Sequence, residues 1–190
     1  MSAKEQTTAL QNAANALKVV IDNTVGSKGT LGYTTDPQIK ERDIIEYDSR
    51  MRVFGMEKFN APCFISYVNF FASSNHQANH QPLGAMIIYI EESNVERFLK
   101  AAGHSIKLDE EKDIVFKVCG EFCKNIAENF KTSIRSLGYN ELIISDPVSY
   151  HNQISEGVPF NYDEYKMYEL IFSIWKQKIL AIDLTLAPPK

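Results

Sequence analysis

Two residue pairs and one longer stripe have the types and spacing that chemistry requires. His76 and His80 are four residues apart, a spacing that could bind a metal ion on a helix, but the polar segment around them predicts a solvated loop without further ligands. Cys119 and Cys123 have the same spacing on an apolar stripe, where cysteine behaves as a small hydrophobic side chain. We therefore predict reduced, buried thiols and no metal site.

The polar stripe recurs at intervals of three and four residues and consists of Lys117, Glu121, Lys124, Asn125 and Glu128. Residues at these spacings share one face of an α-helix. The simplest interpretation is a solvated helix face, on which Lys–Glu pairs contribute little stability. Taken by itself, the stripe favours this interpretation over a functional one.

Helices must position these side chains. The stripe lies on the longest predicted helix, at about residues 112–137, and Gly138 ends that helix. The opposite side of the helix is apolar at helical spacing, with Val115, Cys119, Phe122, Ile126, Phe130 and Leu137. A second amphipathic helix is predicted at about residues 7–25. Ser93 should cap a short helix, with Glu96 completing a capping box.

Strands are predicted where β-branched and aromatic residues cluster: one or two within 39–54, then 63–72, 83–90, 141–145, 165–175 and 178–186. The segments on either side of the polar residues 73–82 should pair as an antiparallel hairpin, and the last two should pair across Lys176-Gln177. Residues 151–160 are predicted as a loop. This order predicts a single α+β domain over residues 1–190, with long helices packed on a largely antiparallel β-sheet.

Composition argues against several function classes. The 190 residues carry a net charge of −4 and no basic run, which argues against nucleic-acid binding. The sequence has no phosphate-binding loop, dinucleotide fingerprint, zinc-protease motif or serine-hydrolase elbow. No apolar run approaches the ~18 residues that a membrane span needs, and the first residues do not resemble a signal peptide. We therefore expect a cytoplasmic protein without membrane contact.

The segment VCGEFCKNIAENFK, residues 118–131, resembles the phosphatase helix of the CheC, CheX and FliY chemotaxis proteins. The signature of that family is Asp or Ser, three residues, Glu, two residues, Asn, twenty-two residues and Pro. With Glu121 on the family glutamate, Pro147 falls on the signature proline and Asn129 on an asparagine that typically trails the signature. The resemblance covers roughly residues 83–186, is strongest to single-domain CheX, and implies a CheC-like fold.

Two positions depart from the signature. Lys117 stands where the family has Asp or Ser, and Lys124 stands where it has Asn. Asn125 follows one residue later, so its spacing from Glu121 is i, i+4 instead of i, i+3. The two spacings differ by about 100° of rotation around the helix.

The resemblance implies hydrolysis of the phosphoaspartate of a CheY-type response regulator. In that mechanism the helix enters the regulator's active site, the glutamate pairs with a regulator lysine, and the asparagine carboxamide orients the attacking water. The regulator would supply Mg²⁺, so no cofactor of its own is expected. Glu121, Asn125 and Lys124 are the catalytic candidates, and the residues expected to bind the partner are Lys117, Glu121, Glu128 and Pro147.

Three hypotheses remain open at this stage. The chain could be an active phosphatase that uses Asn125, or uses Lys124 in another way, although an ammonium group has no acceptor with which to orient water. It could instead be a catalytically silent domain that binds a response regulator or forms a dimeric scaffold, or it could have an unrelated role. A homodimer is expected, because the hydrophobic segments 61–72 and 165–175 could leave exposed sheet edges and because the resemblance implies associating sheets.

Overall fold

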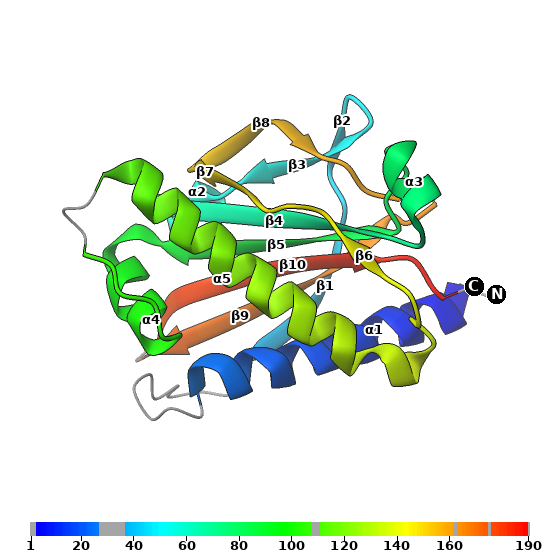
Figure 1. Ribbon diagram of the computed structural model, residues 1–190, viewed down its shortest axis with the longest axis horizontal. Helices are drawn as coiled ribbons and strands as arrows, with labels where there is room; N and C mark the ends of the chain where they lie inside the picture. The colour runs from blue at the N-terminus through cyan, green and yellow to red at the C-terminus, as the bar shows by residue number, and fades with distance from the viewer. Residues whose placement is uncertain (1–2, 27–36, 108–110, 162, 175, 190) are drawn as a thin grey trace.

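The computed structural model describes residues 3–26, 37–107, 111–161, 163–174 and 176–189, and Figure 1 shows the arrangement of its elements. The α-helices are α1 (Ala3–Ile21), α2 (Met56–Phe59), α3 (Ser74–Ala78), α4 (Val95–Ala101) and α5 (Lys112–Ser133). The strands are β1 (Gln38–Asp43), β2 (Glu46–Tyr47), β3 (Arg50–Phe54), β4 (Cys63–Phe71), β5 (Gly84–Glu91), β6 (Ile143–Ile144), β7 (Val148–His151), β8 (Gln153–Val158), β9 (Lys166–Ile174) and β10 (Gln177–Leu186). A π-helical turn, Asp22–Gly26, extends α1, and the 3-10 turns Glu92–Asn94 and Arg135–Leu137 precede α4 and follow α5.

The main sheet has seven strands in the order β1-β9-β10-β5-β4-β6, and β7 also pairs with β4. All of its strand pairs are antiparallel. The two predicted hairpins are confirmed, as β4 with β5 and β9 with β10; Trp175, at the end of one predicted strand, lies outside the described residues. Strands β5 and β10 are buried along most of their length because both faces of the sheet are covered.

The expectation of open edges at residues 61–72 and 165–175 is wrong. Strand β4 is covered by β6 and β7, and strand β9 is covered by β1. Both segments are therefore interior strands, which explains why they are so hydrophobic. The edge argument for a homodimer does not apply to them.

Helices α1, α4 and α5 pack on one face of this sheet (Figure 1). The predicted inward residues within α5 are all buried: Val115, Cys119, Phe122, Ile126 and Phe130. Leu137 is partly buried and lies in the 3-10 turn after the helix, which ends at Ser133 and not at about residue 137 as predicted. Phe122 packs edge-on against Phe98 of α4, with ring centroids 5.2 Å apart, and Phe130 packs against Phe70 of β4 at 5.7 Å. The prediction of long helices on a largely antiparallel sheet is confirmed, and the apolar stripe fixes which side of α5 faces solvent.

A smaller three-stranded sheet, in the order β2-β3-β8, covers the opposite face together with α2. The predicted loop at residues 151–160 is therefore wrong, because most of it forms the end of β7 and all of β8. Strand β8 has only Ile154 and Val158 as large apolar residues, so its alternation is short. Val158 pairs with Met51, a contact far away in sequence that local patterns do not show.

A charged cluster is buried between α2 and the main sheet. Lys58 Nζ lies 2.8 Å from Glu169 Oε1 and 2.8 Å from Asp183 Oδ1, and the Tyr89 hydroxyl donates to Asp183 Oδ2 at 2.7 Å. Burial alone would lower the pKa of Lys58, but the two carboxylates raise it above its usual value. Burial opposes ionisation of Glu169 as well, yet Lys58 and Arg42 hold its pKa below the usual value. Burial raises the pKa of Asp183 despite its contacts with Lys58 and Tyr89.

Two short helices differ from the predictions. Ser93 does not cap a helix with Glu96, because it lies in a 3-10 turn and donates to Glu91 Oε1 at 2.9 Å. The polar connection between β4 and β5 contains α3, which begins where Ser73 accepts a hydrogen bond from the His76 backbone N–H. His80 lies beyond that helix with a φ of 53°, so the two histidines do not share a helix face.

Candidate functional site on helix α5

The polar stripe forms the solvent-facing side of α5. Its predicted members Lys117, Glu121, Asn125 and Glu128 are exposed, and Lys124 is partly covered. The helix is held rigidly because its opposite side is buried over four turns against the sheet and α1. The structure therefore brings the sequence-predicted residues onto one accessible surface, which we call the α5 face and define by these five residues.

The segment between β6 and β7 lies directly against this helix. A Cβ added at Gly120 would lie 3.2 Å from Ser149 Oγ and 3.4 Å from Pro147 Cγ, so the absence of a side chain at Gly120 permits the close approach. Pro147 thus packs beside Gly120, which precedes Glu121 in the sequence. Sequence analysis named Pro147 but not Gly120, whose role depends on the packing of a distant segment.

Lys124 forms an ion pair with the residue that precedes this proline. Its Nζ lies 2.8 Å from Asp146 Oδ1, with side chains that are 45% and 93% exposed respectively. The hydrogen bond and the charge of Asp146 raise the pKa of Lys124, and Lys124 lowers the pKa of Asp146 for the same reasons. Because both groups are solvated, the pair is weak and open to exchange. Sequence analysis did not identify Asp146 as a site residue.

Asn125 points to a different side of the helix from Lys124, because consecutive residues are about 100° apart. Its Oδ1 accepts a hydrogen bond of 2.7 Å from Asn129 Nδ2, one turn further along. Glu128 lies 3.9 Å from Lys131 at its nearest atoms. The carboxamide of Asn125 therefore lies about 100° around the helix from position 124, on the same exposed surface.

Glu121 differs from its neighbours on the α5 face. Within the described parts of the chain, no side chain or backbone group forms a hydrogen bond or ion pair with the Glu121 carboxylate, and the same is true of the Lys117 ammonium. Both side chains are exposed. The α5 face thus presents a carboxylate in mid-helix with no partner among the described residues, a lysine paired with a solvated aspartate, and a carboxamide about 100° around the helix from that lysine.

Neither cysteine of α5 contributes to this surface. Cys119 and Cys123 are buried and free, as predicted. Burial raises the pKa of Cys119 to about 12 and that of Cys123 higher still, so both thiols are protonated and unreactive. Among the described residues, no three His, Cys, Asp or Glu side chains are grouped so that they could hold a metal ion. No described helix is long and apolar enough to cross a membrane.

Comparisons with known proteins identify the fold. No protein-family profile matches the sequence, and no curated protein matches it in sequence either. Among solved structures, the chain is similar to chemotaxis protein CheX from Vibrio vulnificus, with 15% identity and a TM-score of 0.59 over 91% of this chain and 97% of that one. It is also similar to a chain of the CheX–CheY–BeF3–Mg²⁺ complex from Borrelia burgdorferi, with 14% identity and a TM-score of 0.55 over 93% and 96%.

A third solved structure, a CheC-like superfamily protein from Shewanella sp. PV-4, has 14% identity and a TM-score of 0.54 over 97% of each chain. All three alignments span nearly the whole of both proteins, so the similarity concerns a complete fold and not a shared motif. Identities this low establish architecture and leave the activity open. The chain therefore has the CheC-like fold of the CheX and CheC-like chemotaxis proteins, as the α5 segment indicated.

Proposed function

We propose that this chain binds a CheY-type response regulator through the α5 face, and the observation that carries the proposal is the state of Glu121. A carboxylate that is exposed on a rigid helix, with no partner among the described residues, is already placed to pair with a cation on another protein. The similarity in fold to a chain of a CheX–CheY complex supports the choice of partner class. The expected contacts are Lys117, Glu121, Glu128 and Pro147.

Lys124 has a separate role in this proposal, which is to contact the phosphoryl oxygens of the regulator's phosphoaspartate. Its ammonium donors suit phosphoryl oxygens. Asp146 holds Lys124 at the position of the missing carboxamide, and that solvated pair is easily exchanged for a stronger anion. Since an ammonium group cannot accept a hydrogen bond from water, this arrangement favours binding of the phosphorylated regulator without hydrolysis. Any Mg²⁺ would belong to the regulator.

The second candidate function is hydrolysis of the phosphoaspartate, and Asn125 is the residue that favours it. Its carboxamide is exposed and is oriented by the hydrogen bond from Asn129. A carboxamide oxygen has a second lone pair, so Asn125 could accept a hydrogen bond from a water molecule while the bond from Asn129 is kept. Its position, about 100° around the helix from Lys124, is the argument against this candidate.

Titration of the chain against a panel of purified CheY-type regulators, each with and without BeF3 and Mg²⁺, tests the binding proposal. We expect saturable binding that is tighter for the BeF3-bound regulator. Glu121→Ala should weaken it about tenfold or more, because the lost charge pair lies at an interface. Glu46→Ala removes an exposed glutamate of β2 on the opposite layer and serves as the matched control. Binding that Glu121→Ala leaves unchanged would refute the proposed use of this face.

The half-life of the phosphorylated regulator separates the two candidate functions. Binding without hydrolysis predicts that the wild type and Asn125→Ala leave the half-life unchanged or longer, and that Lys124→Asn, which restores Glu-x-x-Asn, shortens it. Hydrolysis through Asn125 predicts that the wild type shortens the half-life and that Asn125→Ala abolishes this effect. Circular dichroism of each variant shows whether the fold is intact, as expected for exposed substitutions.

A further inference from the structure

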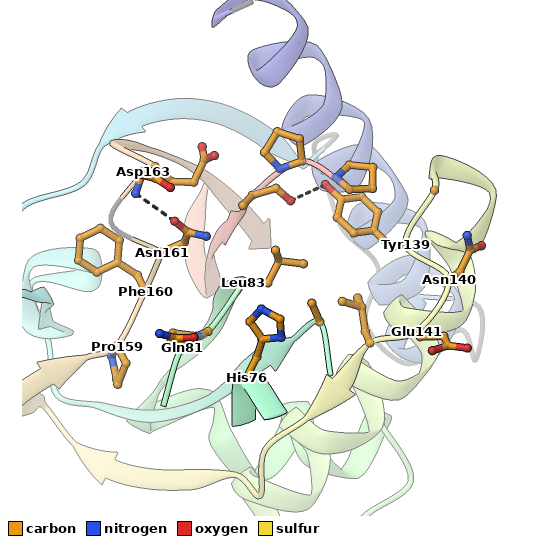
Figure 2. A pocket seen from close by; sticks show the side chains of 18 of the residues that line it. His76, Gln81, Leu83, Tyr139, Asn140, Glu141, Pro159, Phe160, Asn161 and Asp163 are labelled. Carbon is orange, nitrogen blue, oxygen red and sulfur yellow. Dashed lines mark hydrogen bonds between the residues drawn. The ribbon is translucent and has the colours of Figure 1, made fainter. Parts of the chain in front are cut away.

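A pocket of about 970 Å³ lies at the end of the main sheet where β10 finishes, away from Glu121 and the α5 face. It is bounded by the connection between β4 and β5, by residues 138–142, by residues 159–161 and 163–164, and by residues 187–189. Figure 2 shows Phe160 and Asn161 on one side and Tyr139 on the other, with His76 and Gln81 between them. Segments distant in sequence thus converge on one hollow.

Glu164 is the unusual residue of this pocket. It is only 8% exposed, and no described residue forms a hydrogen bond or ion pair with its carboxylate. Its backbone N–H donates to the Asn161 carbonyl at 3.0 Å, which fixes the main chain there. Burial, and then the neighbouring charge of Asp163, raise the pKa of Glu164. A buried carboxylate without a partner is costly, so its presence in the pocket wall points to a missing cation.

The opposite wall is aromatic and fixed. The Tyr139 hydroxyl donates to the Ala187 carbonyl at 3.0 Å, so the phenol ring is held in place. Burial, followed by the charge of Glu164, raises the pKa of Tyr139, and both residues line the pocket. Phe160 is buried beside the pocket, and prolines complete its apolar surface, at positions 82, 159, 188 and 189.

The charges around the pocket have one sign. Glu141, Asp163 and Glu164 line it, whereas none of the described lining residues is a lysine or an arginine. The basic side chains are His76 and His80, and His76 Nδ1 is already within 2.7 Å of Ser73 Oγ. Anionic ligands are disfavoured by three carboxylates. A metal ion is disfavoured too, because no described group of three His, Cys, Asp or Glu residues could hold one.

We propose that this pocket binds a small organic cation with an apolar body, such as an arylalkyl ammonium compound. The ammonium group pairs with the Glu164 carboxylate, and the apolar body packs between Tyr139 and Phe160, whose ring faces also attract a cation. The Glu164 carboxylate, which has no partner among the described residues, then gains one. The site is independent of the α5 face and of the regulator-binding proposal.

Three probes of nearly the same shape and different charge test the proposal: benzylamine, benzyl alcohol and benzoate. Isothermal titration of the wild type should show saturable binding of benzylamine, with weaker binding of benzyl alcohol and none of benzoate. Glu164→Gln should weaken benzylamine binding about tenfold or more and leave benzyl alcohol binding unchanged, because only the charge pair is lost. Glu141→Gln, which changes an exposed carboxylate of the same pocket, is the matched control.

The selectivity of the wild type among the probes is independent of any variant. Equal or tighter binding of benzoate, no saturable binding of benzylamine up to about 10 mM, or benzylamine binding that Glu164→Gln leaves unchanged would each overturn the proposal. Thermal unfolding of Glu164→Gln provides a second measurement. We expect an equal or higher Tm, since the substitution removes an unpartnered buried carboxylate. A large decrease in Tm would show that Glu164 has a structural partner and would also contradict the proposal.

Discussion

Replacement of Lys58 by methionine is the most severe single test of the energetics of this fold. The Lys58 side chain is 14% exposed and is the cation shared by Glu169 and Asp183. Its removal leaves two carboxylates buried against the sheet without their common partner. Breaking a buried ion pair from one side costs about 3–5 kcal/mol in free energy of unfolding. For a domain of this size we expect Tm to fall by roughly 6–20 °C.

The dependence on pH follows from the direction of the pKa changes. In the wild type the depressed pKa of Glu169 contributes stability that is present above its unfolded pKa and is lost as the pH falls through its folded pKa. In Lys58→Met we expect the folded pKa of Glu169 to rise above its unfolded value of about 4 and that of Asp183, already raised in the wild type, to rise further, so protonation favours the folded variant. The difference in stability between the two proteins should therefore be largest at about pH 7.5 and smaller at about pH 4.5.

Urea denaturation followed by circular dichroism at both pH values measures the effect. Lys40→Met, at an exposed position of β1, is the control and should change stability by less than about 0.5 kcal/mol. The triple variant Lys58→Met, Glu169→Gln, Asp183→Asn should recover much of the loss, because no buried charge of the cluster remains unpaired. A loss below about 1 kcal/mol in Lys58→Met, or an equal loss at both pH values, would refute this reasoning.

Three further predictions concern local features. Asp146→Ala should leave Tm nearly unchanged, because its ion pair with Lys124 is solvated. The same substitution should tighten binding of a BeF3-activated regulator, because it frees Lys124. Weaker binding in a titration would contradict the role given to Lys124. Gly157→Ala should lower the free energy of unfolding by more than about 1 kcal/mol, as measured by urea denaturation. Gly157 has a φ of 70°, and an added Cβ would lie 2.9 Å from Met51 O. An unchanged denaturation midpoint would contradict this prediction. The three buried cysteines are Cys63, Cys119 and Cys123, and a thiol reagent at about pH 8 should modify none of them until the protein is denatured. Rapid labelling of the native protein would contradict this and would show that the core opens.

The elements with strong local signals were predictable from the sequence. The apolar stripe of α5 has the spacing of a helix with one buried side, and the hydrophobic segments of β5 and β10 have the length and density of buried strands. Each pattern therefore predicts both the type of element and its burial. The small second sheet was not predictable. Strand β2 has only two residues, and β8 forms by pairing with β3, where Val158 lies opposite Met51, about a hundred residues earlier in the chain. Long-range pairing decided these elements, and local sequence carries little information about it.

The same division applies to the α5 face. Glu121 and Pro147 were identified by their spacing within a known signature, and the structure places them close together on one surface. The ion pair between Lys124 and Asp146 could not be anticipated, because it depends on how closely the segment before β7 approaches Gly120. The Glu164 pocket was missed for a similar reason, since four separate segments build it and none carries a motif.

Strand β1 forms one edge of the main sheet, with no further strand paired to it among the described residues, and its charged side chains alternate between the two faces. Alternate residues point to opposite faces, so Lys40 and Arg42 share one face while Glu41 and Asp43 share the other. A second copy that paired antiparallel with this edge about a two-fold axis would preserve the faces and bring like charges opposite one another. Such cross-strand repulsion disfavours association of two sheets at β1, although the ion pairs of Arg42 with Glu169 and of Lys166 with Glu41 and Asp43 reduce it. We therefore expect β1 to be a poor surface for self-association, and a homodimer, which stays a prediction, to use a different surface.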